Sequence, residues 1–362
     1  MIGLSIGRAL ALRGVRKVTV IEKNDFGREA SWAAGGILAP QVEADKADDF
    51  FQLAHASRDL YPAFAQALLA ETGIDVELDT TGTLYVAFSV EEEAAFRRRF
   101  EWQKREGLEV EWLTGVEARA VEPCLSEHVR CALRFPKDFQ VESRRLVEAL
   151  LVSNRRLGVQ LISDCEVHKI RVSHNQVHGV ETANGFIGAG RVVIAAGAWS
   201  SSIDPSATVQ VEPVRGQMLC FRAETSFARH VIYSSKGYLI PRRDRRLICG
   251  STSEHVGFDK RVTDEGLAAI KAMAVEIAPL IDTLPLVDSW AGFRPHAQDE
   301  MPVLGFSEDV AGLCYATGHY RNGILLAPIT GELIADAIVS RTESSLMAAF
   351  SPQRFHAVSP IG

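Results

Sequence analysis

The sequence has 362 residues, of which 47% are hydrophobic and 23% are charged, and its formal net charge at pH 7 is −7. This length exceeds one ordinary hydrophobic core, so we expect two domains or one elaborate α/β unit. The negative charge argues against a nucleic-acid partner, no apolar run approaches the ~20 residues that span a bilayer, and no signal peptide is visible. Six scattered cysteines without a C-x-x-C pair predict buried free thiols in the reducing cytoplasm and no bound metal.

The chain opens on a pattern typical of a nucleotide-binding unit. An amphipathic helix is expected from Ile2, and Gly14 should end it before a short buried strand over residues 18–21. This is the second half of a βαβ unit, in which Gly3 occupies the place of the third glycine of G-x-G-x-x-G, where helix and strand pack closely. Glu22 follows the strand, where a carboxylate binds ribose hydroxyls. A helix–turn–strand that binds no nucleotide is the alternative.

The first strand and first two glycines of that fingerprint are not present before Ile2. Such a strand is central in the sheet, and its buried side chains and ladder hydrogen bonds are together worth roughly 10 kcal/mol. Whole domains are stable by only about 5–15 kcal/mol. We therefore expect the natural chain to begin upstream of Met1.

The next segments alternate between helix and strand. The small-residue tract over residues 23–37 suits a backbone that approaches a flat ligand closely, or an ordinary loop. Apolar periodicity predicts helices over residues 50–69 and 90–106 and a strand over residues 81–88.

A second βαβ-type run begins near residue 130. We expect a strand over residues 131–135, a helix over residues 143–156 capped by Ser143, and a strand over residues 159–162. A strand meander over residues 167–187 then leads to a buried strand that ends in Ala-Ala-Gly at Gly197. The carboxyl end of such a strand is where an open α/β sheet binds its ligand.

The last part is largely β. Strands are expected at 214–221, 238–241 and 247–252, with a charged hairpin tip at 242–246 and one helix at 264–278. A helix over residues 330–340 completes the chain. The alternation predicts a Rossmann-like domain over residues 1–76, 139–208 and 297–350, a mainly antiparallel-sheet domain over residues 77–138 and 209–296, and a tail over residues 351–362.

Seven stretches occur in an order that resembles one family: the Gly3 helix, then SWAAGGI, VVIAAGAWS, VEPVRGQM, GYLIPRRD, WAGFRP and GHYRNGILLAP. The sequence is similar to the FAD-dependent amine oxidases of the D-amino acid oxidase superfamily, and most of all to the glycine oxidases of ThiO type. The resemblance runs from Ile2 to about Ile338. The missing front of the fingerprint is the departure from the family.

The resemblance implies a fold and a non-covalently bound FAD. The fold is α/β, a Rossmann-like FAD-binding domain with its first strand missing and a mainly antiparallel substrate domain. The segment from His319 to Leu325 would open the C-terminal helix under the flavin, where helix N-terminal amides stabilise negative charge. The residues implied to bind FAD are Ile2, Gly3, Glu22, Lys23, Glu29, Ala30, Ala34, Gly35, Gly36, Val167, Gly197, His319, Tyr320, Arg321, Asn322, Gly323, Ile324 and Leu325.

The resemblance also implies a site for the substrate carboxylate. Arg294 in WAGFRP matches an arginine whose planar guanidinium binds a carboxylate through two parallel hydrogen bonds. Tyr238 matches a tyrosine that supports the same carboxylate, and Arg321 matches a second arginine of the pocket. A surface arginine and a core tyrosine are the alternatives for Arg294 and Tyr238. His319 and Lys236 are expected at the edge of the pocket, without an acid–base role.

The implied reaction is the oxidative deamination of glycine, other small amines or D-amino acids. The products would be an oxo acid, or an imine for thiazole synthesis, with ammonia and hydrogen peroxide, and dioxygen would be the second substrate. A sarcosine oxidase, a quinone-linked D-amino acid dehydrogenase and a flavin-free remnant are the alternatives. We expect no nucleic-acid or membrane partner, and a homo-oligomer is one of the assemblies open to the chain.

Overall fold

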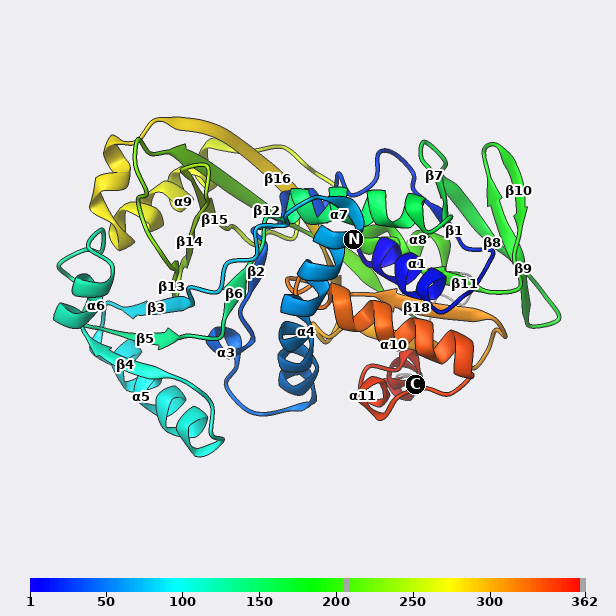
Figure 1. Cartoon of the computed structure of the whole chain (residues 1–362), viewed down its shortest axis with the longest axis horizontal. Helices are drawn as coiled ribbons and strands as arrows, with labels where there is room; N and C mark the ends of the chain where they lie inside the picture. The colour runs from blue at the N-terminus through cyan, green and yellow to red at the C-terminus, as the bar shows by residue number, and fades with distance from the viewer. Residues whose placement is uncertain (205–208, 359–362) are drawn as a thin grey trace.

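The structure is a computed structural model that describes residues 1–204 and 209–358 (Figure 1). It confirms the expected α/β class, with a large mixed sheet on one side and a set of helices and smaller sheets on the other. The expected domain boundary near residue 208 and the end of the expected tail lie outside the described residues. The division into two domains at the stated residues stays a prediction.

The large sheet has eight strands in the order β16-β12-β15-β14-β13-β3-β5-β4. Neighbouring strands are antiparallel except for β13 and β3, which are parallel. The strands β12 and β16 are long enough to reach from the outer end of the sheet to the centre of the molecule (Figure 1). The bounds are β3 (Thr83–Ala87), β4 (Glu111–Thr114), β5 (Cys131–Phe135), β12 (Val211–Arg222), β13 (Val231–Ser234), β14 (Gly237–Pro241), β15 (Arg246–Gly250) and β16 (Leu286–Ala297).

Helices cover this sheet and begin at local caps. Thr263 accepts a hydrogen bond from the Gly266 amide and starts α9, whose apolar side packs on β12, β14 and β15. Ser89 and Glu92 form a reciprocal capping box at the start of α5. The bounds are α5 (Val90–Arg105), α6 (Gly115–Val121), α9 (Asp264–Ile277) and the 3₁₀ helix η2 (Pro279–Thr283).

The Rossmann-like part is built from short parallel strands beneath three helices. β1 pairs with β7, and β11 pairs with β18, while no strand in the described residues joins these two pairs. The helix α1 lies against α7 and α10 (Figure 1). The bounds are α1 (Ile2–Leu12), β1 (Thr19–Ile21), α7 (Ser143–Arg156), β7 (Gln160–Ile162), β11 (Val192–Ile194), β17 (Val303–Phe306), β18 (Leu313–Thr317) and α10 (Ala327–Ser340).

The other elements are short, apart from the long helix α4. The predicted meander is confirmed as the antiparallel sheet β8-β9-β10. The bounds are α2 (Ala30–Ala33), β2 (Ile37–Leu38), α3 (Pro40–Glu43), α4 (Asp49–Thr72), β6 (Phe139–Gln140), β8 (Val167–Ser173), β9 (Gln176–Thr182), β10 (Gly185–Gly188), η1 (Gly197–Trp199), α8 (Ser200–Ile203), α11 (Ser345–Ala348) and η3 (Pro352–Val358). Among the described helices, none combines the length and apolar character that crossing a bilayer requires.

Four local expectations are corrected. The cap of α7 is Glu142, whose carboxylate accepts from the Arg144 amide, and not Ser143, whose hydroxyl donates to the Ala34 carbonyl. The tighter glycine contact between α1 and β1 is at Gly7, where a Cβ would lie 3.0 Å from Val20, while a Cβ at Gly3 would have an ordinary contact of 3.6 Å with the same residue.

The other two corrections concern the charged turn and the last long helix. The turn at residues 242–246 does join β14 to β15, but Arg242 is buried and is not part of an exposed tip. The helix α10 begins at Ala327, so the segment from His319 to Leu325 precedes it as a series of turns and does not form its first turn.

Candidate active site

A cavity of about 860 Å³ lies between the large sheet and the Rossmann-like part. Both sides contribute to its wall, since Gly216 and Arg294 come from β12 and β16, and Gly197 begins η1 shortly after β11. The structure brings most of the predicted site residues to this one cavity. They are Ile2, Ala30, Ala34, Gly35, Gly36, Gly197, Tyr238, Arg294, His319, Tyr320, Arg321, Asn322, Gly323, Ile324 and Leu325.

The remaining predicted residues, Gly3, Glu22, Lys23, Glu29 and Val167, lie outside this lining. Glu22 directly follows β1, and its amide donates to the Ile162 carbonyl at 2.9 Å. Burial raises the pKa of the Glu22 carboxyl above its ordinary value. Lys23 forms an ion pair of 2.9 Å with Glu166. The next residue after Glu166, Val167, begins β8.

Arg294 occupies a defined position on the wall of the cavity. Its Nη1 donates to the Thr252 carbonyl at 3.0 Å, and its Nη2 donates to the Ser251 hydroxyl. The guanidinium lies over Gly216 of the neighbouring strand, where a Cβ would be only 2.5 Å from Nη2. A residue larger than glycine at position 216 would therefore displace the arginine.

Tyr238 converges on the same point. Its hydroxyl donates to the Ser251 hydroxyl at 3.3 Å, so one serine contacts both the tyrosine and Arg294. The two side chains come from β14 and β16, which are not neighbours in the sheet. Their convergence agrees with the expectation that they serve one ligand group.

Arg321 is paired with an acid that the sequence analysis did not identify. Its Nη2 lies 3.0 Å from Oε1 of Glu43, the last residue of α3, and the Tyr233 hydroxyl donates to the same oxygen at 3.3 Å. The Glu43 carboxylate raises the pKa of Arg321 further above its ordinary value. Arg321 therefore differs from Arg294, because the Glu43 carboxylate compensates the charge of Arg321.

The turns from His319 to Leu325 are fixed from below by α4. The Ser57 hydroxyl donates to the Leu325 carbonyl at 2.6 Å, and the Tyr61 hydroxyl donates to the Ile324 carbonyl. His319 is buried, with its Nε2 3.1 Å from the Thr330 hydroxyl. Burial lowers the pKa of His319 to about 3, so this imidazole is neutral near pH 7 and has no positive charge to offer.

The buried neutral state of His319 predicts an acid dependence of stability. Its pKa is about 3 in the folded chain and 6.5 in the unfolded chain, so between these values the unfolded chain binds more protons. The free energy of unfolding should therefore fall as the pH falls below 6.5. From pH 6.5 to 4.5, His319→Asn should lose about 2 kcal/mol less than the unmutated chain in urea titrations. Equal losses in the two proteins would contradict this assignment.

Small residues with fixed backbones form another wall of the cavity. Gly197 has a φ of +56°, and a Cβ there would enter open space. The carbonyl of Gly35 accepts a hydrogen bond of 2.5 Å from buried Arg242, and that of Ala34 accepts one of 2.8 Å from Ser143. The two residues that departed from their predicted roles thus hold this tract in place from behind. The result is a groove with little side-chain bulk, suited to a long ligand that has a flat ring system.

Several residues of the site were missed in the sequence. Arg215 and Gln217, which lie behind the cavity wall, are polar positions two residues apart in the middle of β12, and this period of two was a signal that one face of the strand serves a polar network. Glu43, Ser251 and Thr252 gave no comparable signal, because they lie at the end of a one-turn helix and in a loop.

Comparisons with known proteins agree with this geometry. Residues 1–337 match the DAO family, described as FAD dependent oxidoreductase. The chain is 36% identical to a glycine oxidase of Pseudomonas aeruginosa, covering 97% of this chain and 96% of that protein. It is 37% identical to a bifunctional protein ThiO/ThiG of Trichormus variabilis, covering 98% of this chain and 54% of that protein. The crystal structure of glycine oxidase from Geobacillus kaustophilus superposes with a TM-score of 0.93 at 36% identity, covering 98% of this chain and 96% of that one.

Proposed function

This chain belongs to the DAO family of FAD dependent oxidoreductases, and on that premise we propose that it oxidises glycine and other small amino acids at the carbon that bears the amino group. It is an FAD-dependent amine oxidase, and its relatives include glycine oxidases that align with it over nearly their whole length. The preference for glycine is the proposed part. The position of Arg294 on the cavity wall is the observation that carries it.

Arg294 suits the carboxylate of a small amino acid. Its planar guanidinium is held by Ser251 and Thr252 before any ligand binds, so little rotamer freedom is lost on binding. A carboxylate on this side chain would leave the α-carbon of the substrate inside the cavity. Tyr238 lies beside the same serine, from where its hydroxyl can donate to the carboxylate.

The environment of Arg321, the second arginine, favours a small substrate that has a single negative charge. The carboxylate of Glu43 compensates the charge of Arg321, at 3.0 Å. A substrate with a second carboxylate would have to displace this ion pair. Glycine, sarcosine and D-alanine do not require that displacement.

The described residues fit FAD. The groove of glycine and alanine residues beside Gly197 would hold the cofactor, with Gly35, Gly36 and the turns from His319 to Leu325 around its ring. Glu22, which directly follows β1, would bind the ribose hydroxyls. The bound cofactor supplies the two-electron redox chemistry, so the protein itself has to orient the substrate and exclude water.

Neither His319 nor Lys236 is proposed as a general base. His319 is held neutral by burial, and it is hydrogen-bonded to Thr330 at 3.1 Å. Lys236 forms an ion pair of 2.7 Å with Glu276 at the edge of the cavity. Binding of the substrate with a neutral amine is therefore the proposed route, and the pH dependence of turnover would report the amine of the substrate.

A product assay tests the proposal. Glycine should be consumed with equal amounts of glyoxylate, ammonia and hydrogen peroxide formed, and dioxygen should be taken up in the same ratio. We expect kcat/KM for glycine to be at least as high as for sarcosine and D-alanine. Electron transfer only to quinones or dyes would identify a dehydrogenase, and turnover of sarcosine without glycine would identify a sarcosine oxidase. A purified protein without flavin colour would support the non-enzymatic alternative.

Further parts of the proposal concern the compartment of the enzyme, its oxidant and the use of its reaction. The cytoplasm is the proposed compartment, supported by six cysteines that are all buried free thiols. Dioxygen is the proposed oxidant, and formation of an imine for thiazole synthesis is the proposed use of the reaction. The relative named ThiO/ThiG, 37% identical to this chain, supports that use.

A further inference from the structure

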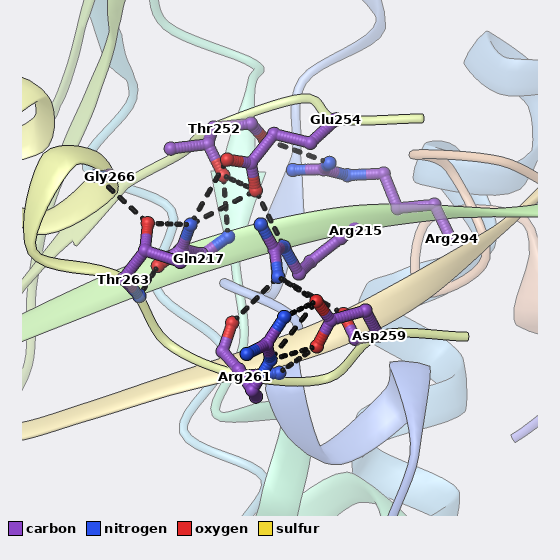
Figure 2. Close-up of polar contacts among 9 residues, drawn as sticks. All are labelled: Arg215, Gln217, Thr252, Glu254, Asp259, Arg261, Thr263, Gly266 and Arg294. Atoms are coloured by element: carbon purple, nitrogen blue, oxygen red, sulfur yellow. Dashed lines mark hydrogen bonds and ion pairs between the residues drawn. The ribbon is translucent and has the colours of Figure 1, made fainter. Parts of the chain in front are cut away.

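The segment over residues 251–263 joins β15 to α9 and carries a network of polar contacts around Glu254 (Figure 2). The Glu254 carboxylate accepts from Arg215 Nε at 2.8 Å and from Gln217 Nε2 at 3.0 Å. It also accepts from the Thr252 hydroxyl at 3.1 Å. Arg215 is 4% exposed and Gln217 is 0% exposed, so the carboxylate is held by two buried donors.

The backbone of the segment is tied to the same strand. Arg215 and Glu254 exchange two backbone hydrogen bonds of 2.9 and 3.0 Å. Arg215 Nη1 also donates to the Arg261 carbonyl at 2.9 Å, and the Gln217 side chain accepts from the Thr263 amide at 2.8 Å. Arg215 and Gln217 therefore fix both ends of the segment to β12.

The network reaches Arg294 through one residue. The hydroxyl of Thr252 donates to Glu254 and accepts from the Gln217 amide at 2.9 Å, while its carbonyl accepts from Arg294 Nη1 at 3.0 Å. In Figure 2, dashed lines join Thr252 to both Glu254 and Arg294. The position of the Thr252 carbonyl, and with it the direction of the guanidinium, depends on how Glu254 holds the threonine.

The far part of the segment contacts the Rossmann-like side. Lys260 Nζ lies 2.6 Å from Oε2 of Glu29, and the Phe258 ring stacks on Trp199 with the centroids 5.0 Å apart and the planes at 27°. The segment thus spans from the sheet that carries Arg294 to the tract that precedes the glycine-rich groove. These contacts restrict its movement relative to both walls of the cavity.

We propose that Glu254 is a positioning residue that orients Arg294 for the substrate carboxylate by fixing Thr252 between β12 and β16. The inference rests on the proposed function, in which Arg294 binds that carboxylate. A carboxylate suits this position because it accepts from all three donors, whereas an amide would place an NH₂ group against at least one of them. Its loss would leave the Asp259 carboxylate, at 3.6 Å, as the charged partner of the buried Arg215. It would also remove the charged acceptor of Gln217 and let Thr252 shift.

Glu254→Gln is the main test, and Glu265→Gln is the matched control because Glu265 is exposed on the first turn of α9. In the FAD-loaded protein, Glu254→Gln should raise the KM for glycine about tenfold while kcat changes by less than about threefold. Isothermal titration with glycolate, a carboxylate that lacks the amine, should show the same loss of affinity. The control should match the unmutated protein in both measurements.

Two further variants keep the test decisive. Thr252→Ala removes the hydroxyl that contacts Glu254 and leaves the contacts of Glu254 with Arg215 and Gln217. It should also raise the KM for glycine, and it replaces Glu254→Gln as the test if that variant does not fold. Arg294→Ala measured in parallel separates the two claims. If Arg294→Ala weakens glycolate binding and both Glu254→Gln and Thr252→Ala do not, the positioning role is wrong and the proposed function stands. If Arg294→Ala has no effect either, the proposed function has failed.

Discussion

Arg294→Ala is expected to raise the KM for glycine by two to three orders of magnitude and to leave bound FAD in place. A bidentate, charge-assisted contact with a carboxylate in a partly buried site is worth about 3–4 kcal/mol, which corresponds to such a factor. The FAD content should not change, because Arg294 lies on β16 with its guanidinium held by Ser251 and Thr252. Steady-state kinetics and the flavin absorbance of the purified variant give both quantities.

Two comparisons sharpen that experiment. Arg294→Lys keeps the charge but loses the planar pair of donors, so its KM should lie between those of the alanine variant and the unmutated enzyme. Arg222→Ala is the matched control, since Arg222 is an exposed arginine at the end of β12 and donates to the Asp244 carbonyl. Turnover of glycine by Arg294→Ala at an unchanged KM would remove Arg294 from the site.

Gly197→Leu is expected to weaken FAD binding by about 10- to 100-fold, as overpacking of a filled site costs about 1–3 kcal/mol. A side chain at this position enters open space beside the groove that would hold the cofactor. The backbone strain of a leucine at a φ of +56° adds a cost to folding that is separate from the effect on FAD. Titration of the flavin-depleted protein with FAD, followed by flavin fluorescence, measures the dissociation constant.

Gly14→Leu separates strain from steric block. Gly14 also has a positive φ, of +80°, and a Cβ there also meets open space, but it lies in the turn after α1 and not on the cavity. Both variants should lose stability by a similar amount, while only Gly197→Leu should lose affinity for FAD. Equal FAD affinities in the two variants would show that Gly197 does not face the cofactor.

Local sequence signals predicted the elements well because each signal acts over a few residues. The helix α5 has its capping box at Ser89 and Glu92, and it begins and ends within one residue of the prediction. The strand β11 and the turn at Gly197 followed from a β-branched run and a glycine. The resemblance to a known family then placed Arg294, Tyr238 and the glycine-rich tract together, although nothing in their spacing along the chain required it.

The failures came from contacts that no local pattern reports. Arg242 looked like part of an exposed turn, but it reaches across to the Gly35 carbonyl, about two hundred positions earlier in the chain. Ser143 had the right residue type for a helix cap, yet its hydroxyl is used by Ala34, and Glu142 caps the helix instead. Glu43 and Glu254 acquire their roles only when Arg321 and Arg215 are brought to them by the tertiary fold.

The proposed function depends above all on the substrate carboxylate binding Arg294 beside the FAD-binding groove. A crystal structure of the FAD-loaded protein with glycolate tests it most directly. We expect both carboxylate oxygens within hydrogen-bonding distance of the Arg294 guanidinium, one of them near the Tyr238 hydroxyl, and the Glu43–Arg321 ion pair intact. Glycolate bound to Arg321, with Arg294 still contacting only Ser251 and Thr252, would contradict the claim.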